Sequence, residues 1–437
     1  MPARPAQLRL DDRDGRRCAG GVHARGGYSA SPVTIRRTPH DFRVEERQTA
    51  DFRASISADR LPSHPFAAYT LEKISLATPD ALAFIANTLK IPRTAIAAAG
   101  LKDRHAVTTQ VVTIDSTAFR GRPPQRFETE SWRLSRLGFV PRAADAGIIE
   151  RNAFTIVVRG LDRWHADELV RRASLLDDGS GTLLFVNYFG DQRFGSARHG
   201  KGFVGRALVE GDFERALQLA IGTPARKDSG AVRTLTRALA THWGDWNAAL
   251  AAFGKMPERG AIEVLARGGS FLDAFAALPK FTQEICVEAY QSHLWNAITR
   301  ELAHAISEAT AQRAFEAEDL FGPMIFPRAA AITPAFLAFP IPMPSPRAVY
   351  HECLSEIVAG VLADEGVALE SLRIPGLARP YFGGGDRPFV ATARAFRIEP
   401  PVPDEFAGGG SANLACTVSF ELPRGAYATV LLRALGQ

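Results

Sequence analysis

Short runs of alternating hydrophobic and polar residues dominate the first half of the chain. Residues 42–45 and 69–74 alternate with a period of two, which is typical of half-buried strands. Further strands are predicted at residues 96–98, 107–114, 154–158 and 183–186. Helices are predicted at residues 78–91 and 164–176. Strands with interleaved helices indicate an α/β or α+β layering.

The first predicted helix has a recognisable beginning and end. Thr78 is expected to cap it, with Pro79 at the first helical position, and Pro92 follows its last turn. Its apolar stripe is expected to consist of Leu82, Phe84, Ile85 and Leu89. This stripe would pack the helix against the neighbouring strands.

The pattern changes after about residue 213. Helices are predicted at residues 215–219, 231–253, 281–307 and 356–362, with proline-rich breaks between them. A strand is then predicted at 414–422 and a last helix at 427–435, so the strand-and-helix pattern of the first part returns. We therefore interpret residues 213–378 as a mainly helical module inserted into a first domain, which comprises residues 32–212 and 379–437. Residues 1–31 are rich in Gly, Arg and Pro without periodicity, and we expect a disordered basic tail.

Composition narrows the class of protein without identifying it. A chain of 437 residues is long for one core, and 46% hydrophobic and 23% charged residues are ordinary for a soluble globular protein. The formal net charge is +5, of which +3 lies in residues 1–31 (six Arg, three Asp), so that +2 remains for the rest. A polyanionic partner is permitted by this charge but not required by it.

The four cysteines do not indicate a metal site or a disulfide framework. None belongs to a C-x-x-C pair; they are Cys18, Cys286, Cys353 and Cys416. Free thiols fit a reducing, cytoplasmic compartment. No apolar run has the length of a membrane span. We also find no set of residues that indicates a metal or a cofactor, so none is expected.

Residues 100–110, GLKDRHAVTTQ, contain the most informative carboxylate. Asp103 stands between Lys102 and Arg104, directly after the predicted strand at 96–98. Nearby positive charge favours its ionised form, which suits nucleophilic attack or charge stabilisation better than proton donation. Local chemistry alone leaves the alternative open, because most such triplets are solvated turns.

Five segments in order carry a resemblance to one enzyme family. The stretch at 100–110 resembles the G-x-K-D-[RK]-H-A-V-T-x-Q motif of the TruD family of tRNA pseudouridine synthases. The other four matches are P-x-D-F-x-V-x-E at 39–46, N-x-F at 152–154, N-Y-F-G-x-Q-R-F-G at 187–195, and L-P-x-G-[SA]-[FY]-A-T at 422–429. The resemblance implies an α+β fold: a mixed-sheet pseudouridine synthase catalytic domain interrupted by a mainly helical, TruD-type insertion domain.

The resemblance also implies roles for individual residues. Asp103 corresponds to the catalytic nucleophile, and Arg36 stands where the family has a lysine that would serve as its basic partner. Arginine keeps the charge but is not a neutral replacement for lysine. The expected nucleotide-contacting residues are Phe42, Asn187 and Tyr427, with Phe189 as a further aromatic wall. For each of these aromatics, core packing is the alternative.

Three neighbours of these residues are expected to have supporting roles. Gln192 and Arg193 would brace their loop or contact phosphate, and His105 would hold the turn beside Asp103 rather than act as a general base.

The implied function is isomerisation of a uridine in tRNA to pseudouridine, at position 13 in the D arm, by a monomer without metal, cofactor or membrane. Two alternatives remain at this stage. A catalytically inactive homologue could bind or remodel tRNA without chemistry, and Arg36 argues slightly for this. A metal-dependent nuclease would need clustered carboxylates or histidines, which are not found near the basic residues.

Overall fold

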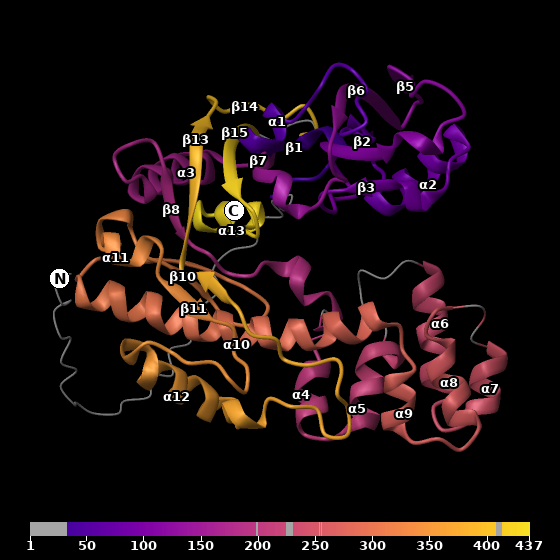
Figure 1. The fold of residues 1–437 in the computed structure, drawn as a ribbon. Helices are drawn as coiled ribbons and strands as arrows, with labels where there is room; N and C mark the ends of the chain where they lie inside the picture. The colour runs from indigo at the N-terminus through magenta and orange to yellow at the C-terminus, as the bar shows by residue number, and fades with distance from the viewer. Residues whose placement is uncertain (1–32, 198–199, 224–229, 253, 255, 408–412) are drawn as a thin grey trace. The chain divides into compact units, whose positions relative to one another are not determined.

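A mixed β-sheet carries the predicted strands in the computed structural model of the chain (Figure 1). The structure describes residues 33–197, 200–223, 230–252, 254, 256–407 and 413–437. The tail predicted at residues 1–31 lies outside the described residues. Residues 33–437 form one compact unit. A mixed sheet combined with many helices confirms the predicted α+β class.

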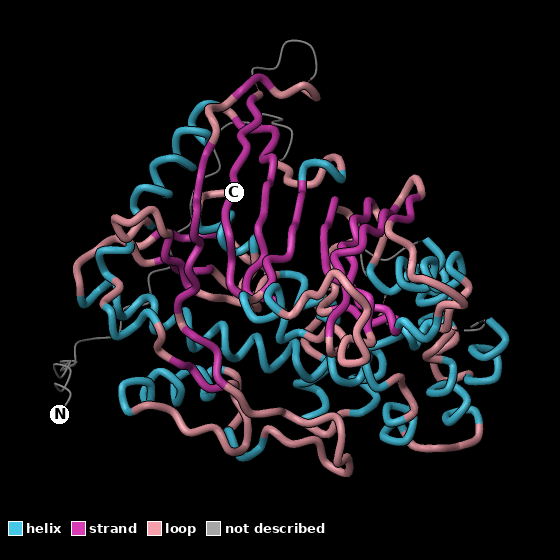
Figure 2. Tube along the Cα trace, turned by 45° about the horizontal axis from the view of Figure 1, so that its top comes forward, coloured by secondary structure: helices cyan, strands magenta, loops and turns pink. Residues whose placement is uncertain are grey.

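The main path of this sheet contains nine strands. Their spatial order is β5 (Arg126–Glu128), β6 (Trp132–Val140), β2 (Phe66–Ile74), β4 (Val107–Asp115), β1 (Phe42–Gln48), β7 (Ile149–Leu161), β15 (Leu414–Pro423), β13 (Val390–Ile398) and β8 (Leu183–Val186). Two short strands pair beside the path: β3 (Ile96–Ala98) on β4 and β14 (Val402–Pro403) on β15. In Figure 2 the longer strands run side by side as one sheet.

One parallel pair positions the residues of interest. β1 and β4 pair in parallel, with Arg43 opposite Val107, whereas β1 pairs antiparallel with β7. Parallel strands begin at the same edge of a sheet. The segment before β1, which contains Arg36, and the segment before β4, which contains Asp103, are therefore brought together by strand register.

A second register brings two later segments together. β8 and β13 pair antiparallel, with Val186 opposite Val390. The end of β8 therefore lies beside the beginning of β13, and Asn187 N–H donates to the carbonyl of Phe389 at 2.8 Å. Asn187 and Arg387 are consequently neighbours although they are far apart in the chain.

Most of the helices lie between residues 204 and 364. The helices of the described residues are α1 (Ala50–Ala54), α2 (Thr78–Leu89), α3 (Arg163–Leu176), α4 (Val204–Val209), α5 (Phe213–Leu217), α6 (Gly230–Thr241), α7 (Trp246–Ala252), α8 (Arg259–Ala266), α9 (Phe271–Ala276), α10 (Lys280–Ala309), α11 (Pro334–Leu337), α12 (Ser355–Asp364) and α13 (Ala428–Ala434). One cluster of buried side chains includes Val158 and Phe185 of the sheet together with Trp295 of α10 and Leu362 of α12. The domain limits at 212/213 and 378/379 stay predictions.

Two predicted helices differ from the structure. The helix predicted at 231–253 is broken into α6 and α7, because Gly244 between them has a φ of +95°, a left-handed conformation that ends a helix; Phe253 lies outside the described residues. In α2, Thr78 is the first helical residue rather than the cap, and Phe84 is 49% exposed. The buried face of α2 consists instead of Ala81, Leu82, Ile85 and Ala86.

A buried cation ties β7 to the segment that precedes β1. Arg159 on β7 pairs with Asp41 at 2.8 Å, Asp404 at 3.0 Å and Glu405 at 2.8 Å. Burial alone would raise the pKa of Asp41, but hydrogen bonds from Arg159 and from the Thr38 backbone bring it below its ordinary value. A lowered pKa means that Asp41 contributes stability above its unfolded pKa and loses that contribution as the pH falls.

Replacing Arg159 by methionine should lower the free energy of unfolding by about 3–5 kcal/mol at pH 7, because two buried carboxylates lose their counter-charge. The difference from the wild type should shrink as the pH falls toward the unfolded pKa of Asp41, because the buried carboxylate of the variant is protonated first and protonation removes the uncompensated charge. Urea unfolding followed by circular dichroism between pH 3.5 and 7 measures this. The control is Arg163→Met, which breaks an exposed pair with Asp167 and should cost less than about 1 kcal/mol.

Candidate active site

Two side chains, one from β4 and one from α2, hold the loop between β3 and β4. Gln110 Nε2 donates to the carbonyl of Gly100 at 3.1 Å, and the Thr78 hydroxyl donates to Gln110 Oε1 at 2.9 Å. The same hydroxyl accepts the backbone N–H of Lys102 at 3.0 Å. Thr78 therefore does not cap α2, because its oxygen is used to fix the loop that carries Asp103.

Two lysines fix the same loop from inside. Lys73 is 1% exposed, and its ammonium donates to the carbonyls of Leu76 at 2.6 Å and Asp103 at 3.0 Å. Burial lowers the pKa of Lys73 to about 8, although the Asp103 carboxylate acts in the opposite direction. Lys102 Nζ lies 2.7 Å from Glu46 Oε1 on β1 in a nearly buried ion pair. The backbone on both sides of the Asp103 side chain is thus anchored.

The Asp103 carboxylate has one partner on each oxygen. Arg36 Nη2 donates to Oδ2 at 3.0 Å, and Gln192 Nε2 donates to Oδ1 at 2.9 Å. Both Asp103 and Arg36 remain more than a quarter exposed, so the pair faces open space. The Arg36 guanidinium also lies over the ring of Phe42, 4.1 Å from its centroid. The carboxylate is held in position while it stays accessible.

A cavity of about 270 Å³ opens at this carboxylate. Arg36, Asp103, Gln192 and Tyr427 line it. Its aromatic and amide walls also include Phe42, Asn152 and Phe154. The Oδ1 atom of Asn152 is buried and has no hydrogen-bond partner among the described residues. The cavity therefore combines an anion, a cation, flat apolar faces and an amide whose oxygen has no hydrogen-bond partner among the described residues.

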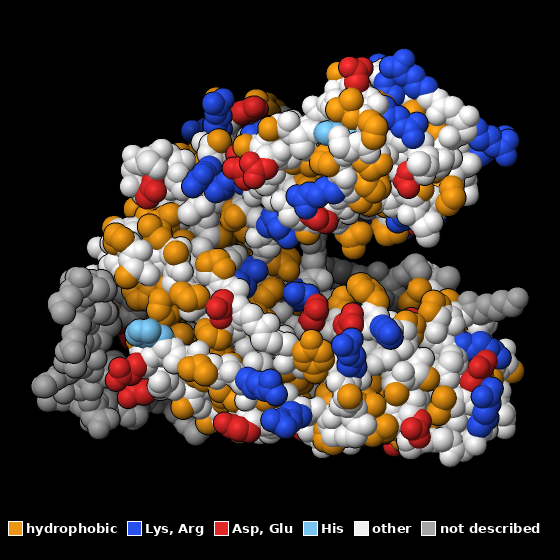
Figure 3. Space-filling view, in the orientation of Figure 1, with side chains coloured by type: hydrophobic (Ala, Val, Ile, Leu, Met, Phe, Trp, Pro, Cys, Tyr) orange, Lys and Arg blue, Asp and Glu red, His pale blue; other side chains and the backbone are white. Residues whose placement is uncertain are grey.

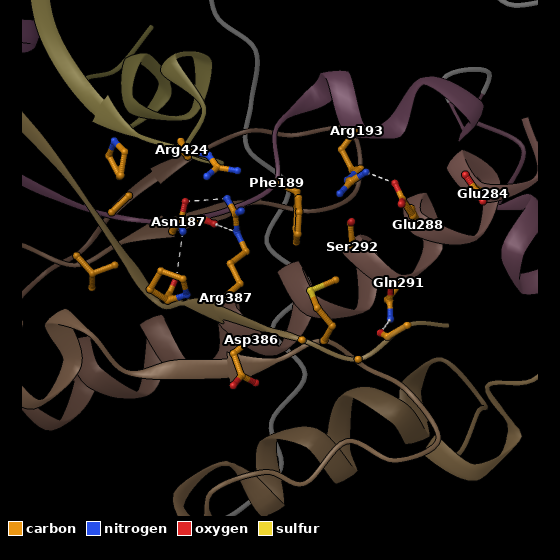
Figure 4. A pocket seen from close by; sticks show the side chains of 18 of the residues that line it. Asn187, Phe189, Arg193, Glu284, Glu288, Gln291, Ser292, Asp386, Arg387 and Arg424 are labelled. Carbon is orange, nitrogen blue, oxygen red and sulfur yellow. Dashed lines mark hydrogen bonds and ion pairs between the residues drawn. The ribbon is translucent and has the colours of Figure 1, made fainter. Parts of the chain in front are cut away.

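Asn187 and Phe189 line a different, larger cavity of about 760 Å³ (Figure 4). The Asn187 amide is already used, since Nδ2 donates to the carbonyl of Pro388 at 3.1 Å and Oδ1 accepts from Arg387 at 2.7 Å. Phe189 is 5% exposed and packs edge-on against Trp295. Of the other predicted site residues, Arg36, Phe42 and Tyr427 share the smaller cavity with Asp103, whereas Asn187 and Phe189 do not.

Three residues at this site were missed or assigned another role from the sequence. Gln192 was expected to brace its own loop and instead contacts Asp103, while Lys73 and Asn152 had no predicted role. The N-x-F match at 152–154 could have drawn attention to Asn152, whereas a single lysine in an alternating strand gives no such indication. His105 is exposed and does not line the smaller cavity.

Comparisons with known proteins identify the family of this chain. The sequence profile of the family described as tRNA pseudouridine synthase D (TruD) matches residues 29–321. The chain belongs to the TruD family. Its fold agrees with the crystal structure of the putative TruD from Methanosarcina mazei, with a TM-score of 0.61, 22% identity and 92% of each chain covered. The family and the fold class predicted from the sequence are thereby confirmed.

Curated relatives of this TruD family member match along most of its length. The tRNA pseudouridine synthase D of Aquifex aeolicus is 28% identical over 92% of this chain and 98% of the relative. The probable tRNA pseudouridine synthase D of Methanopyrus kandleri is 31% identical over 85% of each. The prediction that the chain is an enzyme of this class, a tRNA pseudouridine synthase, is confirmed by this membership.

The remaining features of this TruD family member are its charged side chains, its cysteines and the lengths of its helices. On the face drawn in Figure 3, Lys and Arg side chains are interspersed with acidic ones, and several lie around the hollow at the centre of the view. Cys286, Cys353 and Cys416 are free, and Cys18 lies outside the described residues. None of the helices within the described residues combines the length and apolar character that crossing a bilayer requires.

The buried ammonium of Lys73 predicts an unusual dependence of stability on pH. Its folded pKa of about 8 lies below the unfolded value of 10.5, so the unfolded chain binds more protons between these values. This group should therefore increase stability as the pH rises from about 8 to 10.5. The wild type should become more stable relative to Lys73→Met over that window. Urea unfolding of both proteins at pH 7.5, 9 and 10 tests this, with the exposed Lys280→Met as the matched control, for which the difference should stay constant.

Proposed function

We propose that this chain converts a uridine of tRNA to pseudouridine, with Asp103 as the nucleophile and position 13 of the D arm as the target. The observation that carries the proposal is the Asp103 carboxylate in its cavity, held by Arg36 on one oxygen and Gln192 on the other. A donor on each oxygen stabilises the anion and fixes its direction without covering it.

The volume of the cavity fits a single pyrimidine base. A cavity of about 270 Å³ corresponds to roughly nine water molecules at ~30 Å³ each. Bonded atoms of a base occupy less volume than the same number of water molecules, so the cavity has room for a pyrimidine base. A base inside a helix cannot reach such a cavity, so the target nucleotide would be turned out of its stack. Phe154 and Tyr427 would then supply flat surfaces against which the base can pack, whereas Phe42 is 1% exposed and supports the wall behind the Arg36 guanidinium.

The reaction needs no external oxidant, reductant or donor group. The glycosidic bond between C1′ and N1 breaks, the base turns, and a bond forms between C1′ and C5. One proton leaves C5 and one is gained at N1, so that substrate and product are isomers. The Asp103 carboxylate would either bond to C1′ or remove the 2′ proton on a glycal route; both routes require an ionised carboxylate near the ribose.

Asn152 supports recognition of the base in this cavity. Its unpartnered Oδ1 is buried in the structure and would accept the N–H of a uracil edge once the side chain turns into the cavity, whereas the amide of Asn187 is already bonded on both atoms. A buried acceptor without a partner costs free energy, which a donor on the base would recover. We therefore assign the base-reading role to Asn152 and a structural role in the neighbouring cavity to Asn187.

The Asp103→Asn variant should abolish pseudouridine formation, with a fall of roughly 10³-fold or more in rate, because an amide cannot act as the nucleophile. Carbodiimide mapping of unmodified tRNA transcripts after incubation with each protein measures this. The wild type should give a new reverse-transcription stop in the D arm that the variant does not give.

A binding measurement on the same variant separates the enzyme from an inactive tRNA-binding homologue. Affinity for tRNA should stay within a few-fold of the wild type, because the change removes one charge from a partly exposed pair. Tight tRNA binding without a stop in any transcript, even with the wild type, would favour the non-catalytic binder.

Arg36 should contribute through its charge. Arg36→Met should lower the single-turnover rate by about 10²-fold, because the carboxylate loses its only cationic hydrogen-bond partner among the described residues. Arg36→Lys should recover most of that loss, since a lysine in an extended side chain can still donate to Oδ2. Equal rates for the methionine and lysine variants would show that the charge at this position is not used.

A further inference from the structure

The larger cavity of about 760 Å³ is not used by the chemistry proposed for Asp103. The two cavities meet at one turn of the chain. Pro423 and Arg424 line the larger cavity, and Gly425, Ala426 and Tyr427 line the smaller one. Consecutive Cα atoms are about 3.8 Å apart, so the two linings are adjacent within the length of one residue. A polynucleotide that enters one cavity can therefore reach the other.

Two arginines without a carboxylate partner stand at this junction. Arg387 donates to the carbonyls of Asn187 at 2.8 Å and Gly425 at 2.9 Å and to the Asn187 side chain, all of which are neutral. Arg424 is exposed and makes no ion pair within the described part of the chain. Burial lowers the pKa of Arg387 to about 10, which leaves it charged at neutral pH. Because no carboxylate neutralises these two guanidinium groups, their positive charge is available to a phosphate.

The acidic groups of the larger cavity lie away from this junction. Glu288 on α10 is neutralised by its ion pair with Arg193, and Glu284 lies one turn before it on the same helix. In Figure 4 Asp386 points in the opposite direction from the Arg387 guanidinium. The phosphate-binding character is thus confined to the edge that adjoins the smaller cavity.

The lining of the larger cavity also offers a free aromatic face and an open backbone. Tyr381 is 64% exposed, and no other ring packs on it among the described residues. A side chain added at Gly384 or Gly385 would meet nothing within 4 Å, so this backbone can be approached closely. The loop is anchored from inside, since Gln291 donates to the carbonyl of Gly383 at 2.7 Å. An exposed ring in the same cavity as cations is typical of a site for single-stranded nucleic acid.

We propose that the larger cavity binds a second, unpaired nucleotide of the RNA, the one directly bonded to the target uridine. Its phosphate lies at Arg387 and Arg424, and its base stacks on Tyr381. This inference rests on the proposed function, because it places the target uridine at Asp103. It explains why the cavity adjoining that site is large, why its junction carries unpaired arginines, and why a tyrosine ring on its wall is left uncovered.

The test combines a change in the protein with a change in the RNA. The RNA is a tRNA transcript in which the nucleotide on the 5′ or the 3′ side of position 13 is replaced by an abasic ribose. Affinities are measured in the Asp103→Asn background, so that no turnover occurs during binding. The protein variants are Tyr381→Ala and Tyr381→Phe, with Trp164→Ala as the control, because Trp164 is also 64% exposed and lines neither cavity.

Tyr381→Ala should weaken binding of the intact transcript by roughly 5- to 150-fold, the range expected for loss of one base–aromatic stack. One abasic position should cost a similar factor, and the two changes together should cost no more than either alone. Tyr381→Phe should bind like the parent, and Trp164→Ala should be without effect. Arg424→Ala should reduce the slope of log affinity against log salt by about 1.

Two outcomes would overturn the second site. One is an unchanged affinity of Tyr381→Ala for intact RNA; the other is the same loss on intact and on both abasic transcripts. Pseudouridine formation by the wild type on the intact transcript is measured separately. If the expected losses of affinity are found but the wild type forms no pseudouridine, the proposed function alone is contradicted. If the wild type forms pseudouridine but the expected losses of affinity are not found, the second site alone is contradicted.

Discussion

Lys102 and Glu46 form an ion pair in the interior, with Nζ 2.7 Å from Oε1 and with side chains that are 9% and 0% exposed. Removing such charges from water costs several kcal/mol per ion, so a buried pair persists only with close contact and further hydrogen bonds. Glu46 also accepts the N–H of Val111, which lies on β4. One carboxylate thereby joins β1, β4 and the residue directly before Asp103. The position of the proposed nucleophile follows from this pair together with the parallel register of the two strands.

The loop that carries Asp103 would otherwise be free to move, because it is a connection at the edge of the sheet. Lys73 and Thr78 hold its backbone, and Arg36 and Gln192 hold the carboxylate itself. These partners come from four separate segments of the chain. Donors that are fixed before the substrate arrives do not have to be reorganised during the reaction, which is the main electrostatic advantage of an enzyme site over water. The same arrangement explains the motif at 100–110, since Gln110 has no contact with the cavity and is needed to hold Gly100.

Part of this structure could be predicted from the sequence, and the limits have physical causes. Strands β1, β2, β4, β7 and β8 and helix α10 follow from hydrophobic periodicity, which depends only on local spacing. The pairing of Asp103 with Arg36 was expected from the family resemblance. Periodicity says nothing about which distant side chain fills a gap, so the contact of Gln192 with Asp103 and the burial of Lys73 were not foreseen. The family resemblance places Asn187 at the base, and local spacing could not show that the register of β8 with β13 brings its amide against Arg387 and Pro388.

The small net charge of the folded part is compatible with an RNA substrate because some cations are paired with carboxylates and others have only neutral partners. Two of the buried cations are neutralised inside the protein: Arg159 by three carboxylates and Lys102 by Glu46. Arg387 differs, because its partners are carbonyls and an amide, which stabilise a guanidinium through their dipoles but do not cancel its charge. A cation that is stacked at 4.2 Å from the centroid of Phe189 and shielded from bulk water exerts its field over a longer distance than an exposed one. In the proposed mode of binding, a few unpaired groups at the junction of the two cavities attract the polyanion, and a large overall positive charge is not required.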